Sequence, residues 1–364
     1  MASEESKPPL GDRLAAGSTF LTLTLVGVVA YVIVLCVLVK HREDYHLKYK
    51  FYYLIWILAL GDLGVFFAVV TVALPLTFAG APLYGDGTLL VSLASVDTLA
   101  FYTTLYASFV ISLDRLVCFT SRTWYERLFR GRGVAAQLLG IVFMAASKVA
   151  LTELLWNSKK FSHTGFFFYF SSNVGSAVET WVAKDWLYWS LNACHELHKL
   201  TTVSAPLLSL LFYVFAYWKM RRLACKVDSS SASTQEQSRE RSLLCQGLVI
   251  STSTGIEIAL FLFSEDVVRF AEAAVGSPLA GSLLVSGYVI VNSSVNPFVY
   301  LLCHPQIRRQ ALILLHLRQP KVPRKSLATV CIQQELQVNG KKKRSSNISI
   351  QVRAFQDKHQ YRTM

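Results

Sequence analysis

The sequence predicts an all-α membrane protein, a bundle of seven transmembrane helices followed by a short amphipathic helix. Of its 364 residues, 53% are apolar and only 16% are charged, whereas soluble domains carry about a quarter charged residues. The apolar residues fall into seven long runs, and a helix needs roughly 20 mainly apolar residues to cross a bilayer. Short basic clusters separate several of these runs, as expected of loops at a membrane surface.

The predicted spans cover 18–39, 51–78, 88–120, 133–156, 200–218, 243–263 and 279–303. The first run is too long for the core of a signal peptide and lacks a small-residue cleavage site, so we interpret it as a retained span. The bundle therefore occupies 18–303, after a short extracellular N-terminus at 1–17. Pro75, Pro206 and Pro297 lie inside spans, where neighbouring helices can satisfy the carbonyls that proline frees.

The segment after the last span divides into two parts. In 304–317, basic and apolar residues alternate at helical spacing, which predicts an amphipathic helix on the inner membrane surface. The basic segment 318–364 is predicted to be a disordered cytosolic tail. Cys303 and Cys331 are candidates for palmitoylation, which would attach this tail to the lipid.

Basic residues predict the orientation. With an extracellular N-terminus, the cytosolic loops carry 14 Lys and Arg residues and the extracellular segments carry 7. An excess of Lys and Arg marks the cytosolic side, so we expect a multi-pass protein of the plasma membrane with a cytosolic C-terminus. The net charge of +13 does not indicate nucleic-acid binding, because the basic residues lie between and after the apolar runs. The sequence contains none of the common catalytic or metal-binding motifs.

Ionisable side chains inside a membrane are costly and usually functional. Asp62 lies in the middle of the second span within LALGD, and Asp97 lies in the third span, which ends with Asp114, Arg115 and Leu116. The last span ends in the sequence NSSVNPFVY, residues 292–300.

These motifs resemble those of rhodopsin-like G protein-coupled receptors. LALGD is similar to the LAxAD motif of that family, the Asp-Arg-Leu triplet at 114–116 to its DRY motif, and NPFVY at 296–300 to its NPxxY motif. The resemblance implies a receptor for an extracellular ligand that activates a heterotrimeric G protein. Arrestin, a receptor kinase and membrane lipid are further expected partners.

The resemblance also implies roles for individual residues. The activation switch and G protein contact would comprise Asp114, Arg115, Asn296, Pro297 and Tyr300. No cofactor is expected beyond a possible allosteric sodium ion, since carboxylate, hydroxyl and amide oxygens suit a hard cation. That ion would lie among Asp62, Thr104, Asn292, Ser293 and Asn296. A hydrogen-bonded network without an ion is the alternative.

The candidate ligand-binding residues are Asp97, Glu257 and Phe101. Asp97 lies 18 residues before Arg115, where amine receptors of the family carry an aspartate that binds the ligand's ammonium. In the alternative interpretations Asp97 pairs with Lys148, caps an internal network or is hydrated in a polar cavity. The aromatic loop between the fourth and fifth spans is expected to lie at the membrane interface or to form a lid over the ligand.

Several family hallmarks are missing. The first span has no asparagine, the sixth has neither proline nor tryptophan, and Leu90 stands near the usual position of a disulfide cysteine. These departures favour a divergent member that recognises a small chemical, an amine or a short peptide, as orphan, chemosensory or neuropeptide receptors do. A non-signalling scaffold or decoy remains an alternative, and a transporter is a weaker one.

Overall fold

The structure is a computed structural model that describes residues 8–40, 51–84, 88–129, 132–155, 157–162, 165–172, 184–224 and 231–317. Residues 1–314 form one compact unit and 315–364 a second, of which only 315–317 belong to the described ranges. The predicted tail at 318–364 and Cys331 lie outside them.

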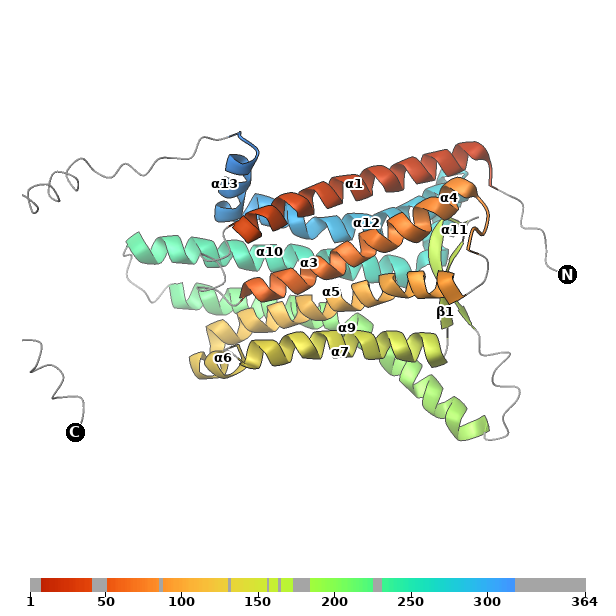
Figure 1. The fold of residues 1–364 in the computed structure, drawn as a ribbon. Helices are drawn as coiled ribbons and strands as arrows, with labels where there is room; N and C mark the ends of the chain where they lie inside the picture. Colours follow the sequence, from red (N-terminus) through yellow and green to blue (C-terminus); the bar gives the residue numbers. More distant parts are fainter. Residues whose placement is uncertain are drawn as a thin grey trace, which may run out of the picture. The chain divides into compact units, whose positions relative to one another are not determined.

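The first unit is an all-helical bundle with one small hairpin (Figure 1). Its described helices are α1 (Leu10–Lys40), α3 (Phe51–Ala68), the π-helical turn η1 (Val69–Ala73), α4 (Leu74–Ala79), α5 (Thr88–Thr120), α6 (Arg122–Leu128), α7 (Arg132–Leu155), α9 (Lys184–Ala224), α10 (Ser231–Leu262), α11 (Ser264–Val275), α12 (Pro278–Cys303) and α13 (Pro305–Leu314). The strands β1 (Asn157–Ser162) and β2 (Phe167–Ser172) pair in antiparallel register.

Seven helical stretches in the described part of the chain are long and apolar enough to cross a membrane, which confirms the predicted number of spans. The helices extend beyond the spans, however. Helix α1 begins at Leu10 rather than at residue 18, and α9 and α10 begin at Lys184 and Ser231 rather than at residues 200 and 243. Hydropathy detects the part of a helix that lies in lipid, whereas a helix continues as long as its backbone and contacts support it.

One such contact holds the start of α1, which begins before the boundary predicted after residue 17. The Arg13 guanidinium donates hydrogen bonds to the carbonyl oxygens of Phe78 and Ala79, at 3.1 and 2.7 Å. These carbonyls lie at the C-terminal end of α4, where helix carbonyls lack intrahelical partners and a cation is favourable. Residues 10–17 are therefore helical and contact the rest of the bundle through Arg13.

Pro75 is accommodated by a local change in the second span. A proline in a helix cannot donate to the carbonyl four residues earlier, here that of Thr71. The Tyr84 hydroxyl donates to the Thr71 carbonyl at 2.6 Å, and η1 widens the helix immediately before the proline. The freed backbone group is thus satisfied inside the bundle.

Helix α5 is the centre of the bundle and contacts α3, α7, α9 and α10, while α12 packs against α1, α10 and α11. Figure 1 shows α4, α11 and β1 at one end of this unit and α6 and α13 at the other. We call these the hairpin end and the Arg115 end. Helix α13 packs on α1 and α12 and buries Ile307 and Ala311, so the short helix predicted after the last span is present.

The sequence did not predict the hairpin. Phe161 of β1 and Phe166 at the turn are buried in an apolar cluster that also contains Leu90 of α5. The Ser286 hydroxyl on α12 donates to the Phe166 carbonyl at 2.9 Å. The hairpin therefore packs onto the bundle, which fits the lid interpretation of this loop.

Candidate functional site

Asp62 is the centre of a buried polar cluster that joins four helices. Its Oδ1 accepts a hydrogen bond from the Thr104 hydroxyl at 3.1 Å, and its Oδ2 accepts one from the Asn296 amide at 2.5 Å and another from the Tyr31 hydroxyl. Asp62 and Tyr31 are each 1% exposed. Gly61 lets α3 approach α5 here, because a Cβ at this position would lie 2.4 Å from the Thr104 hydroxyl. The cluster ties α1, α3, α5 and α12 together.

Sequence reasoning missed Tyr31, although a signal was present. Tyrosine is enriched where a span meets the membrane surface, and a buried tyrosine hydroxyl usually needs a partner. Tyr31 lies inside the first predicted span, so its hydroxyl required a partner elsewhere in the bundle. The first span has no asparagine, and the Tyr31 hydroxyl is the group through which α1 bonds to Asp62.

The structure brings together three of the five residues predicted to hold sodium, namely Asp62, Thr104 and Asn296. The Asn292 amide instead donates to Glu257, and the Ser293 hydroxyl donates to the Val289 carbonyl at 3.2 Å.

The arrangement around Asp62 combines hydrogen-bond donors with one acceptor oxygen that has no partner among the described residues. Each contact described above places a hydrogen-bond donor on the Asp62 carboxylate, while Asn296 Oδ1 is buried without a hydrogen-bond partner among the described residues. These contacts form a hydrogen-bonded network around Asp62, and the sodium ion and the network without an ion both stay predictions.

The ligand-binding candidates lie towards the hairpin end. Asp97 on α5 forms an ion pair with Lys159 of β1, and both side chains are buried. Phe101, one turn further along α5, packs in a cluster with Tyr102 and Ile258. Ile258 follows Glu257 on α10, so the three candidates line neighbouring parts of the bundle.

The partner of Asp97 is not the lysine that sequence reasoning considered. Lys148 on α7 donates to the Thr201 hydroxyl on α9 at 3.0 Å, and Lys159 comes from the loop beyond the fourth span. Because helical spacing constrains only residues on one helix, a partner on a hairpin could not be identified from the sequence.

The Asp114–Arg115 pair lies on α5 towards the Arg115 end. Arg115 Nε is 3.5 Å from Asp114 Oδ2, and both residues are buried. Tyr300 of the NPFVY segment is 2% exposed and packs in a cluster with Val37, Leu58 and Ile307. The predicted switch residues thus lie on two helices, α5 and α12.

Two further contacts hold the helices together at this end. The Ser242 hydroxyl on α10 donates to the Cys303 carbonyl at the end of α12. The ring of Tyr213 on α9 lies so close to Gly247 on α10 that a Cβ there would be 2.1 Å from Tyr213 Cζ. The structure therefore has α10 packed against both α9 and α12.

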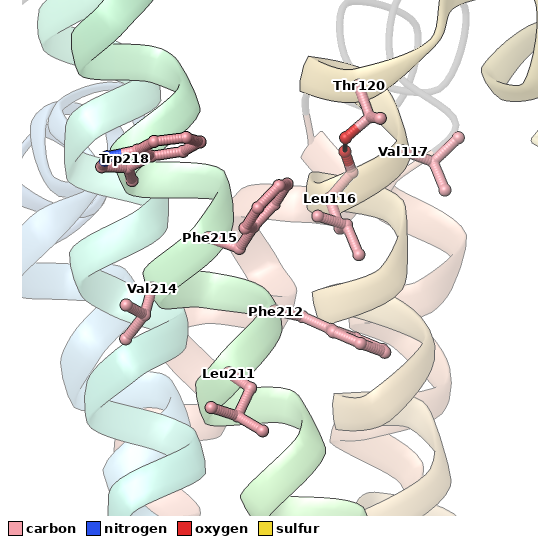
Figure 2. Close-up of a pocket in the computed structure, with 8 residues that line it drawn as sticks. All are labelled: Leu116, Val117, Thr120, Leu211, Phe212, Val214, Phe215 and Trp218. Carbon is pink, nitrogen blue, oxygen red and sulfur yellow. Dashed lines mark hydrogen bonds between the residues drawn. The ribbon is translucent and has the colours of Figure 1, made fainter.

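An apolar pocket of about 620 Å³ lies between α5 and α9 on the flank of this end. Figure 2 shows Phe212 and Phe215 extending from α9 towards α5, and the Thr120 hydroxyl donating to the Leu116 carbonyl at 2.7 Å. Ligand sites usually combine an apolar lining with a few convergent polar groups. Since the Thr120 hydroxyl is already engaged, the pocket offers less of that chemistry than the region around Asp97 and Glu257.

The comparison with known families agrees with this geometry. The family model described as "7 transmembrane receptor (rhodopsin family)" matches residues 30–300, which include Asp62, Asp97, Arg115, Glu257 and Tyr300. No curated protein matches the chain.

Proposed function

Because the chain belongs to the rhodopsin family of seven-transmembrane receptors, we propose that it binds an extracellular ligand at the hairpin end and activates a heterotrimeric G protein at the Arg115 end. Members of this family are multi-pass membrane receptors that signal through G proteins when a ligand binds, and they are not enzymes. The observation that carries the proposal is the buried Asp114–Arg115 pair, at the opposite end of α5 from Asp97.

The orientation follows from the basic residues. Lys and Arg in the loops favour a cytosolic Arg115 end, which leaves the hairpin end and the N-terminus outside the plasma membrane. Arrestin, a receptor kinase and membrane lipid would then meet the Arg115 end, together with α13. Asp97, Glu257 and Phe101 would face the ligand, whether a small chemical, an amine or a short peptide.

Coupling requires the Arg115 end to open. We propose that the Asp114 carboxylate holds Arg115 at rest through a charge-assisted contact, and that α10 separates from α9 and α12 to admit the G protein. The contacts that resist this movement are the Ser242–Cys303 hydrogen bond and the packing of Tyr213 on Gly247. We expect Pro297 and Tyr300 to move with α12 when α10 separates from it.

The test is expression with a panel of G protein activation sensors, with amines, short amidated peptides and small odorants as ligands. We expect basal or ligand-driven signalling from the wild type that Arg115→Ala strongly reduces at matched surface level. Equal signalling from both would show that Arg115 is not the coupling residue. Complete silence of a well-expressed wild type would favour the scaffold or decoy alternative.

Gly247→Ala is expected to raise basal signalling about two- to tenfold. The new methyl group overlaps the Tyr213 ring, and overpacking of this kind costs about 1–3 kcal/mol in the close-packed arrangement. The variant should therefore favour separation of α9 from α10. The measurement is basal sensor activity at matched surface level.

Gly255→Ala on the same helix is the matched control, because a Cβ there meets nothing within 4 Å. It makes the same chemical change without the overlap and should leave basal signalling unchanged. An equal rise in both variants would attribute the effect to backbone stiffening of α10 and contradict the proposed packing mechanism.

A further inference from the structure

The hairpin inserts a buried lysine into the bundle. Lys159 of β1 is 6% exposed and ion-paired with Asp97, which is 5% exposed. Its ammonium also lies 5.1 Å from the centroid of the Phe168 ring on β2, within the range of a cation–π contact. A lysine is almost never buried to this extent unless it is paired.

The remainder of the hairpin holds this lysine in place without a covalent bond among the described contacts. Phe161 and Phe166 pack in the cluster that contains Leu90, and Ser286 binds the Phe166 carbonyl. Phe166 has φ of +55°, a left-handed conformation that is unusual for a bulky residue. Such strain persists only where surrounding contacts enforce it, and it is common at ligand clamps and switch regions.

The charges explain why a lysine is inserted here. Asp97 and Glu257 are both buried acidic side chains, and Asp97 is the one that forms the ion pair with Lys159. Asn292 donates to Glu257 but carries no charge. An uncompensated carboxylate in a low-dielectric interior is strongly unfavourable, so this region requires a cation, and the hairpin supplies it.

We infer that Lys159 is the chain's own cationic occupant of the anionic site at Asp97, and that this ion pair fastens the β1–β2 hairpin over the bundle as a lid. In the resting chain, Asp97 is then the counter-ion of the lid. The inference goes beyond the proposed function, because it concerns how the hairpin is held and does not require coupling to a G protein.

The first experiment measures the thermal stability of the purified full-length chain in detergent. Lys159→Met leaves Asp97 without its ammonium partner and should lower Tm by about 5–10 °C, since breaking a buried ion pair is strongly destabilising. The control is Lys160→Met on the same strand, whose side chain points to the opposite face and is partly exposed. We expect a change of less than about 2 °C there.

A double substitution distinguishes the ion pair from general damage. Lys159→Met combined with Asp97→Asn replaces the pair with neutral groups, which is often tolerated when loss of one partner is not. The double variant should therefore regain most of the Tm lost in Lys159→Met. Additive losses from the two substitutions would overturn the inference.

Chemical complementation tests the cation itself. Lys159→Ala opens space next to Asp97, and ethylammonium chloride should raise its Tm by several degrees more than potassium chloride at equal concentration. Neither Lys160→Ala nor the wild type should show this difference. If Lys159→Ala does not discriminate ethylammonium from potassium, or if Lys160→Ala responds equally, Lys159 is not the occupant of this site. Both experiments read stability, so their failure would leave the test of G protein coupling unaffected.

Discussion

Replacing Arg115 with alanine is expected to reduce G protein activation about 10- to 100-fold at matched surface level. A guanidinium makes up to five directional hydrogen bonds, and each bond to a charged group contributes about 1.5–3 kcal/mol. Loss of one such hydrogen bond between Arg115 and the G protein therefore corresponds to one or two orders of magnitude in the affinity of the receptor for the G protein. The measurement is the initial rate of sensor activation at several receptor densities.

Asp114→Asn is the companion variant, because it changes the other partner and should have the opposite effect. It weakens the contact that holds Arg115 at 3.5 Å, so basal signalling should rise. A misfolded bundle would lower signalling and surface level in both variants. Loss of signalling in Asp114→Asn at normal surface level would contradict the proposed role of the aspartate.

The sequence predicted the number and order of the spans because lipid imposes a length and composition that seven runs satisfy. It did not predict the helix ends, since the Arg13 contacts that support the start of α1 join residues far apart in the chain. The hairpin was also missed. Its aromatic segment suits a membrane interface as well as a strand, and only its packing on Leu90 distinguishes the two.

The candidate site was predictable where a motif fixes a residue's depth in a span. Asp62, Thr104 and Asn296 meet as expected, because they lie at similar depths on adjacent helices. Asn292 lies one turn from Asn296 yet turns to Glu257 on α10. Depth is set by sequence position, whereas the choice between two carboxylates depends on helix rotation, which a single sequence does not specify.

Removal of the Asp62 carboxylate is the change with the largest expected effect on stability. Asp62→Ala leaves three buried donors, on Tyr31, Thr104 and Asn296, without their acceptor. Each unsatisfied buried group costs about 1–3 kcal/mol, and the combined loss should lower Tm by about 10 °C. The measurement is thermal unfolding of the purified full-length chain in detergent.

Thr24→Val on α1 provides the control. Its hydroxyl is buried and has no hydrogen-bond partner among the described residues. Since valine has nearly the same shape, removing this hydroxyl should leave Tm unchanged or raise it slightly. A similar loss in Thr24→Val and Asp62→Ala would show that the bundle responds to any polar substitution in its interior, and the Asp62 cluster would have no special role.

The effect of sodium on Tm distinguishes a hydrogen-bonded network from a site that binds an ion. Tyr31, Thr104 and Asn296 all donate to the carboxylate, so we expect the network to be stable without a metal. The wild type should have the same Tm in sodium chloride as in choline chloride of equal ionic strength. A rise specific to sodium that disappears in Asp62→Ala would mean that an ion binds at Asp62 and that the network alone does not describe the cluster.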